Sequence, residues 1–150
     1  MTKIAKVASP AATAVLKQAT ALWPRRRKTS DGLLPSLEHI KANPKSDHNT
    51  GLAVDITHDP KRGVDCAELF VKLQQDNRVL YLIFNGKIWF KSEGTKKYTG
   101  PNPHTKHLHL SIQKQHSKDT SPWFPWAGEP KVIGKLIAKV SRKKKKTKTS

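Results

Sequence analysis

Residues 79–90 read Val-Leu-Tyr-Leu-Ile-Phe-Asn-Gly-Lys-Ile-Trp-Phe, and this stretch decides the fold class. Two apolar, β-prone runs, 79–84 and 87–90, flank the pair Asn85-Gly86. Asn-Gly suits a two-residue hairpin turn, because both central positions of that turn need a positive φ. The stretch therefore predicts two antiparallel strands joined by a tight turn.

Two more short and mostly apolar runs, residues 52–56 and 108–112, predict two further strands. Residues 10–22 predict a helix, because Ser9 is a suitable N-cap and Pro10 occupies the first helical position.

Asp65 is predicted to cap a second helix of about eleven residues, whose apolar positions recur at helical spacing. A short helix is predicted over residues 33–40, and residues 93–103 are predicted to form a polar loop. These elements together predict an α+β domain, in which a small antiparallel sheet has flanking helices packed on one face.

The chain is long enough for one domain with a modest core, and its composition shifts near residue 128. We expect a folded domain over residues 1–128 and a basic segment over residues 129–150. Apolar residues within 131–140 recur on one helix face with lysines around it, a pattern typical of a helix on an anionic surface. The single cysteine, Cys66, excludes an internal disulfide.

The formal net charge of +18 predicts attraction to a polyanion such as nucleic acid, teichoic acid, lipopolysaccharide or anionic lipid. Two alternatives stay open for residues 131–148: a helix docked on the domain with a solvated charged end, or a segment that contacts an anionic membrane or envelope polymer. Nucleic acid is the less favoured partner, and the protein is expected to be a monomer. No stretch has the roughly 18 continuous apolar residues that would span a bilayer. Residues 11–22 are interrupted by polar side chains, so they do not form the core of a signal peptide.

The strand predicted over residues 108–112 decides which histidines share a face. Successive side chains of a strand point to opposite sides of the sheet. If the apolar residues of this strand face the core, then His107, His109 and Ser111 lie together on the opposite face.

Residues 46–55 read Ser-Asp-His-Asn-Thr-Gly-Leu-Ala-Val-Asp and place His48 and Asp55 on either side of a glycine-containing turn. Zinc accepts imidazole nitrogen and carboxylate oxygen, and three protein ligands with an open fourth position are typical of catalytic zinc. A His-x-His pair alone is weak evidence, but together with this segment it indicates a metal site. We therefore predict that Zn²⁺ binds to His48, Asp55 and His109, and that Ser46 helps to orient the ligands.

Hydrolysis also needs a group that moves protons, and His107 is the candidate because it shares a strand face with His109. His104, on a proline-bounded turn, is expected to orient His107 or to bind substrate. An arginine would stabilise a developing oxyanion or hold a substrate carboxylate. The arginines at positions 25–27 are the candidates, and Arg27 is the preferred one.

The pattern Ser-x-His-x-x-Gly-x-Ala-x-Asp over residues 46–55, followed by His-x-His over 107–109, resembles a known group of zinc peptidases. The group includes D-Ala-D-Ala carboxypeptidases, L-alanyl-D-glutamate endopeptidases and murein endopeptidases. It shares its metal site with lysostaphin-type enzymes and the hedgehog signalling domain. The resemblance implies zinc on His48, Asp55 and His109, and a hedgehog-like or D-Ala-D-Ala peptidase-like fold with a zinc cleft.

The same resemblance implies a catalytic role for His107. Many relatives carry a glutamate three residues before the last ligand, but Lys106 occupies that position here, so the glutamate version does not apply. The spacing His104-x-x-His107-x-His109 is more similar to the murein endopeptidase branch. Four short stretches also resemble a phage-associated subgroup: Leu22-Trp23-Pro24, Ser30-Asp31-Gly32, Thr57-His58-Asp59-Pro60 and Tyr98-Thr99-Gly100.

The expected function is therefore a zinc metallopeptidase of the phage lysin type, which hydrolyses stem peptides or cross-links of bacterial peptidoglycan with zinc-activated water. An endopeptidase is favoured over a carboxypeptidase. Such a protein is expected in the host cytoplasm before lysis and then at the cell wall or periplasm. Two alternatives stay open: a metal-dependent nuclease, and a non-catalytic cell-wall binding module that keeps the zinc site.

Overall fold

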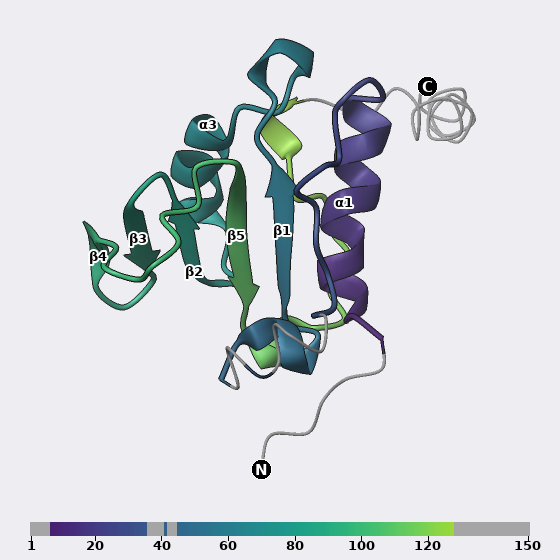
Figure 1. Cartoon of the computed structure of the whole chain (residues 1–150). Coiled ribbons are helices and arrows are strands. Elements are labelled where there is room, and N and C mark those ends of the chain that lie inside the picture. The colour runs from purple at the N-terminus through teal and green to yellow at the C-terminus, as the bar shows by residue number, and fades with distance from the viewer. Residues whose placement is uncertain (1–6, 36–40, 42–44, 128–150) are drawn as a thin grey trace.

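The computed structural model describes residues 7–35, 41 and 45–127. Within them, an open antiparallel sheet has the strand order β1-β5-β2-β3-β4 (Figure 1). The strands are β1 (Ala53–Thr57), β2 (Val79–Phe84), β3 (Lys87–Phe90), β4 (Gly94–Lys97) and β5 (His107–Ile112). The predicted α+β class with a small antiparallel sheet is confirmed.

The predicted hairpin is formed by β2 and β3, and its turn residues Asn85 and Gly86 have φ values of 49° and 78°. The prediction of a loop over residues 93–103 is wrong in part, because β4 lies within it and pairs with β3. The four residues of β4 are Gly-Thr-Lys-Lys, so no apolar alternation marks this strand in the sequence. Charged lysines are typical of an exposed edge strand, where they discourage pairing with other chains.

Within the described part of the chain, α1 and α3 accompany the sheet. The first, α1 (Pro10–Leu22), begins as predicted, with the Ser9 hydroxyl accepting a hydrogen bond from a backbone N–H of the first turn. The second, α3 (Cys66–Lys72), is capped by the Asp65 carboxylate and continues into a short 3₁₀ turn.

The helix predicted over residues 33–40 is not present at 33–35, and residues 36–40 lie outside the described part of the chain. Pro35 explains the difference, since a residue before proline is disfavoured in the α region. Residues 129–150, with their predicted amphipathic helix, also lie outside the described part. No helix among the described residues is long and apolar enough to cross a bilayer.

The two faces of the sheet differ in character. Apolar side chains on one face pack against α1 and α3 and form the core. They come from alternate positions of the strands, except that the register of β2 shifts after Val79: Val54, Ile56, Val79, Leu82, Phe84, Leu108, Leu110 and Ile112. The three apolar residues of β5 lie in this core, whereas His107 and His109 line a cavity on the other face, which confirms the predicted alternation. Trp123 closes the core from the C-terminal segment, and its indole N–H donates to the Ala11 carbonyl at 3.0 Å.

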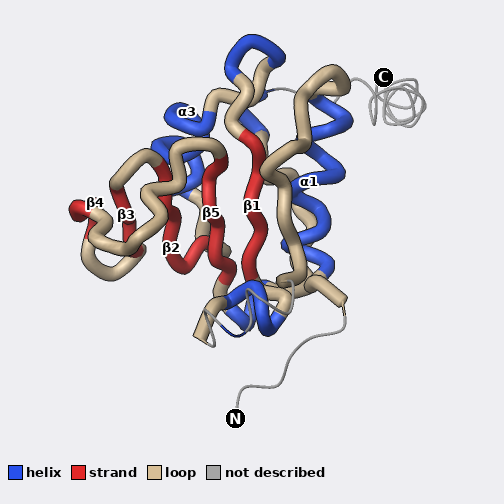
Figure 2. Tube along the Cα trace, viewed as in Figure 1, coloured by secondary structure: helices blue, strands red, loops and turns tan. Residues whose placement is uncertain are grey.

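The opposite face of the sheet carries the polar side chains. Beside its first strand runs the loop that follows α1 (Figure 2), and Gly32 in this loop forms an isolated bridge with Asp55. The bridge consists of two backbone hydrogen bonds of 3.0 and 2.8 Å. It covers the outer edge of β1 and engages both the backbone N–H and the carbonyl of Asp55.

Candidate metal centre

Three segments bring two histidines and one aspartate together on the polar face of the sheet. Asp55 in β1 and His109 in β5 are directly opposite partners in the antiparallel ladder, so their side chains are neighbours. His48 lies on a 3₁₀ turn (Asp47–Thr50) that precedes β1. Gly51 ends this turn with a φ of 76°, a conformation that glycine adopts without strain, and the chain then enters β1.

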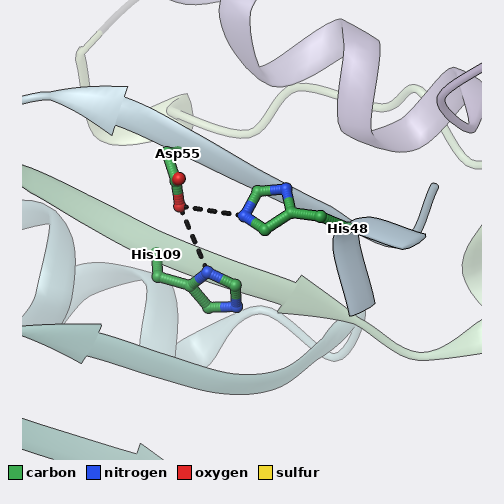
Figure 3. Close-up of side chains that lie close together, drawn as sticks. All are labelled: His48, Asp55 and His109. Carbon is green, nitrogen blue, oxygen red and sulfur yellow. Dashed lines mark hydrogen bonds and ion pairs between the residues drawn. The ribbon is translucent and has the colours of Figure 1, made fainter. Parts of the chain in front are cut away.

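The side chains of these residues converge on one oxygen (Figure 3). Asp55 Oδ1 lies 3.3 Å from His48 Nε2 and 3.1 Å from His109 Nδ1. One potential ligand atom from each of the three residues lies within 4.8 Å of the others, a separation that suits a shared metal ion. Both histidines are only 6% exposed, so this is a buried polar cluster that opens into a cavity.

Two hydrogen bonds orient His48. Its backbone N–H donates to the Ser46 hydroxyl at 3.2 Å, and its Nδ1 lies 3.0 Å from the Leu33 carbonyl oxygen. A carbonyl only accepts, so Nδ1 is the protonated nitrogen of a neutral His48 and Nε2 carries the lone pair. That lone pair faces the acceptor oxygen of Asp55. A proton or a metal cation between the two groups turns this repulsion into attraction.

His109 has a partner on each ring nitrogen. Nδ1 faces Asp55, and Nε2 lies 2.8 Å from the Ser111 hydroxyl two residues along β5. A serine hydroxyl donates or accepts, so it is compatible with either tautomer of the ring. Metal-binding histidines commonly have such a partner on the nitrogen that does not bind the metal.

The pKa values of Asp55 and His48 show how strongly these two groups interact. Burial alone would raise the pKa of Asp55, but hydrogen bonds from His109 and from the protonated form of His48 outweigh it and hold that pKa well below its ordinary range. Burial alone would lower the pKa of His48, but the hydrogen bond and the charge of Asp55 raise it above its ordinary value. The carboxylate is therefore ionised and ready to bind a cation.

The cluster lines a cavity of about 570 Å³. The residues around it come from the turn before β1, from β1, β2 and β5, and from the loop before β5: Lys45, Ser46, His48, Asp55, Tyr81, Ile83, Tyr98, Asn102, His104, His107 and His109. The predicted residues Ser46, His104 and His107 therefore lie in the same cavity as the three potential ligands.

His107 and His104 lie side by side in this cavity, with ring centroids 4.9 Å apart. His107 Nε2 is 3.6 Å from Asp55 Oδ2, the carboxylate oxygen that the other two histidines do not share. Burial lowers the pKa of His107 although Asp55 opposes this effect, so His107 is neutral near pH 7. Burial also lowers the pKa of His104, to about 4.

The backbone of His104 is in the left-handed region, with a φ of 59°. Its Nδ1 lies 2.6 Å from the Asn102 carbonyl, so this nitrogen carries the proton and Nε2 is an acceptor. Strained backbone of this kind is concentrated at functional sites.

Sequence reasoning missed four polar residues of the cavity: Lys45, Tyr81, Tyr98 and Asn102. The ring of Tyr81 stacks on His109 at 5.4 Å, and burial raises the pKa of its hydroxyl to about 12. The same strand alternation that was applied to β5 would have found Tyr81 on β2. Tyr98 and Asn102 lie on an irregular loop, where no periodicity indicates their direction.

The structure does not bring Arg27 to the cavity. Its backbone N–H donates to Asp59 Oδ2 at 3.0 Å and its side chain is exposed. Arg26 is buried and pairs with Asp31 at 2.8 Å, and Arg25 lines a different cavity. Of the described lysines and arginines, Lys45 alone lines the cavity of the candidate metal centre, called the metal-centre cavity below.

Comparison with known proteins identifies the family. A family model described as "VldE, C-terminal domain" matches residues 5–109, which is more than half of the chain. The matched residues include His48 and Asp55 and end at His109. No curated protein and no solved structure matches the chain. The chain belongs to the VldE C-terminal domain family.

Proposed function

We propose that this protein is a zinc-dependent peptidase that hydrolyses peptide bonds in the stem peptides or cross-links of bacterial peptidoglycan. One observation carries the proposal. His48, Asp55 and His109 come from three segments, converge within 4.8 Å, and line a cavity with His107 beside them. The similarity of residues 46–55 and 107–109 to the peptidoglycan peptidases supports the same function.

The donor set fits zinc. Two imidazole nitrogens and one carboxylate oxygen are donors that catalytic zinc sites use, and they leave a coordination position open. His48 Nε2, Asp55 Oδ1 and His109 Nδ1 would hold the ion, because these atoms face one another. When bound, zinc acts as a Lewis acid that activates water and polarises a carbonyl. The cation would also remove the repulsion between the acceptor atoms of His48 and Asp55.

His107 is the residue that we propose moves the proton. It is neutral near pH 7 in the metal-free protein, so it has a lone pair with which to accept a proton from water. Its Nε2 is near Asp55 Oδ2, and the negative charge of this oxygen stabilises the imidazolium that forms. His104, with its Nε2 as an acceptor, is proposed to hold a donor group of the substrate or to fix the ring of His107.

Lys45 takes the role that the sequence assigned to Arg27. A cation in the cavity stabilises negative charge on a carbonyl oxygen or holds a substrate carboxylate. Lys45 is positioned for this role, because it lines the cavity together with Ser46 and His48. Peptidoglycan stems have free carboxylates, so a cationic residue at this rim suits such a substrate. We favour an endopeptidase of the lysin type that acts at the cell wall.

The decisive experiment incubates the purified full chain with purified peptidoglycan, with either stoichiometric zinc or a chelator, and identifies released fragments by mass spectrometry. The expected result is zinc-dependent release of peptides with new amino termini. An endopeptidase releases fragments of several residues, whereas a carboxypeptidase releases single terminal residues. His107→Ala is expected to abolish release while retaining zinc, and His116→Ala is the matched control because His116 does not line the cavity.

Two outcomes would replace the proposal. If peptidoglycan stays intact while DNA is cut in a zinc-dependent reaction, the protein is a nuclease. If neither polymer is cut although zinc is bound and the protein sediments with peptidoglycan, it is a binding module.

A further inference from the structure

A second cavity, of about 550 Å³, lies between the end of α1 and the loop that follows β1. These two segments are at the top of the view in Figure 1. The cavity is lined by apolar residues from α1 and its C-terminal end and by cations from both segments: Leu22, Trp23, Pro24, Arg25, Lys61 and Arg62. None of these residues lines the metal-centre cavity.

Close packing holds the two sides of this cavity together. Gly63 lies directly against the Trp23 indole, since a Cβ atom on Gly63 would be only 2.2 Å from Trp23 Cδ1. Phe124 contacts the same indole edge to face, with ring centroids 5.3 Å apart. The Arg27 backbone N–H donates to the buried carboxylate of Asp59. The hollow is therefore formed by packed backbone and rings, and its cationic side chains are exposed.

The positive charge around this hollow is largely uncompensated. Asp59 is the acidic partner on this side, and it pairs with Arg62 at 3.3 Å. Within the described part of the chain, no ion pair involves Arg25 or Lys61. Both side chains are exposed. Two unpaired cations and one partly compensated guanidinium thus face a single concave surface.

We propose that this hollow is an anion-binding site that takes the phosphodiester groups of an anionic polyol-phosphate polymer. Two guanidinium groups and one ammonium group offer donors to several oxygens of one phosphate, and arginine matches phosphate geometry well. Single-stranded nucleic acid also carries phosphates, but its binding sites stack bases on open aromatic rings. The Trp23 indole already packs against Gly63 and Phe124 and is half-buried, so it forms a wall of the hollow. This favours a polymer without bases.

The choice of a bacterial wall polymer as the source of these phosphodiesters rests on the proposed function, but the anion site itself does not. The test therefore measures binding and no peptidase activity. Poly(glycerol phosphate) of defined length is titrated into the full chain by calorimetry at low and at physiological salt, because exposed charges are screened by salt. Oligo(dT) and poly-glutamate of the same charge serve as alternative probes.

The test variant is Arg25→Gln with Lys61→Gln, which removes the two unpaired cations and leaves the Arg62–Asp59 pair in place. The control is Lys114→Gln with Lys118→Gln, which removes equal charge from exposed positions. These positions flank Ser117, whose carbonyl accepts from the Ala11 backbone at the opposite end of α1. Residues 128–150 are identical in both variants, so their lysines contribute equally to each measurement.

The test variant is expected to bind poly(glycerol phosphate) about fivefold more weakly than wild type, because it loses two exposed charge contacts. The control is expected to change affinity by less than twofold, and Arg25→Lys with Lys61→Arg is expected to restore binding. Thermal melts establish that each variant folds. Equal losses in test and control variants would overturn the site, as would an absence of binding by wild type. Tighter binding of oligo(dT) or of poly-glutamate, with the same dependence on Arg25 and Lys61, would overturn the polyol-phosphate assignment.

Discussion

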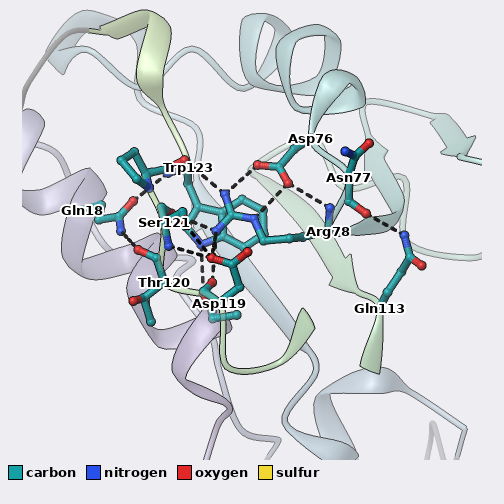
Figure 4. Close-up of polar contacts among 11 residues, drawn as sticks. Gln18, Asp76, Asn77, Arg78, Gln113, Asp119, Thr120, Ser121 and Trp123 are labelled. Carbon is teal, nitrogen blue, oxygen red and sulfur yellow. Dashed lines mark hydrogen bonds and ion pairs between the residues drawn. The ribbon is translucent and has the colours of Figure 1, made fainter. Parts of the chain in front are cut away.

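The candidate metal centre and the surroundings of Arg78 are both built from charged or titratable side chains with little exposure, yet they use their hydrogen-bonding capacity in different ways. Arg78 precedes β2, is 5% exposed, and is surrounded by acceptors (Figure 4). Its five N–H groups bond to the Asp76 carboxylate at 2.9 and 2.6 Å and to three backbone carbonyls of residues 119–122. Its guanidinium also lies 3.5 Å from the centroid of the Trp123 ring.

At the candidate metal centre the groups converge on one oxygen instead of forming separate pairs. Asp55 Oδ1 faces two imidazole nitrogens, and the hydrogen bond to Leu33 makes the facing nitrogen of a neutral His48 an acceptor. The fully satisfied cluster around Arg78 fastens the segment of residues 119–123 to the start of β2. The converging cluster has a place for a cation and opens into a cavity. Complete satisfaction of a buried charge indicates a structural role, and converging acceptors indicate a binding role.

The largest effect is expected for Asp55→Asn. The substitution keeps the size of the side chain but removes the charge that both histidines share, so zinc affinity is expected to fall by more than about 100-fold. Peptide release from peptidoglycan is expected to disappear as well. Titration calorimetry with zinc measures the affinity, and Glu93→Gln, at an exposed acidic position, is the control. Unchanged zinc affinity in Asp55→Asn would place the metal elsewhere.

Arg78→Met is expected to have the opposite signature, a loss of stability without a loss of binding. It removes the side-chain donors of the Asp76 carboxylate and of three carbonyls, while the backbone N–H of residue 78 still donates to Asp76 Oδ1. The free energy of unfolding is therefore expected to fall by about 3 kcal/mol. Urea denaturation measures this change, and zinc affinity of the folded variant is expected to stay unchanged. Arg62→Met removes a more exposed ion pair and is expected to cost less than about 1 kcal/mol. Equal losses in the two variants would show that the cluster around Arg78 has no special structural role.

Ser111→Ala tests whether Ser111 orients His109 or binds the metal itself. The variant removes the hydroxyl beside His109 Nε2 and leaves every potential metal ligand in place. Zinc affinity is expected to fall by about tenfold, which is typical for loss of such a partner. Calorimetry again provides the measurement, with Ser92→Ala, at an exposed position, as the control. A loss as large as that of Asp55→Asn would indicate that Ser111 contacts the metal.

The smallest effect is expected for pH. Asp55 raises the pKa of His48, and zinc must displace the proton from Nε2, so zinc affinity is expected to decrease as the pH falls through that pKa. Asp55 contributes nothing to this dependence above pH 5, because its own pKa is held well below the ordinary range. The decrease between pH 7 and pH 6 is expected to be less than about tenfold for one proton. Calorimetry in buffers of different ionisation enthalpy counts the released protons, and affinity that does not vary from pH 6 to pH 8 would contradict the expectation.

Local patterns predicted the parts of the fold that local physics controls. The Asn85-Gly86 turn, the Ser9 cap of α1 and the alternation along β5 depend on residues that are close in the sequence. The edge strand β4 was missed because its pairing with β3 stabilises it, while its lysine-rich residues have no apolar pattern. Such pairing is a property of two strands together and is not visible in either one.

The candidate site also contains residues that local patterns predict and residues that only tertiary contacts determine. The residue types and their spacing indicated His48, Asp55 and His109, and the alternation on β5 placed His107 beside His109. The sequence does not show which of the three arginines at positions 25–27 points toward the site, because tertiary contacts set the direction of each side chain. Arg27 does not reach the cavity.

The sequence by itself determined which chemistry is available, because donor types and short-range spacing are local properties of the chain. Only the tertiary structure decided which basic side chain lines the cavity, since Lys45 and Arg27 are both basic and differ in what packs around them. It also decided that Tyr81, Tyr98 and Asn102 line the same cavity, and that the Leu33 carbonyl orients His48. The physical reason is that such contacts join residues far apart along the chain. Their geometry is set by the ladder between β1 and β5 and by the core behind it.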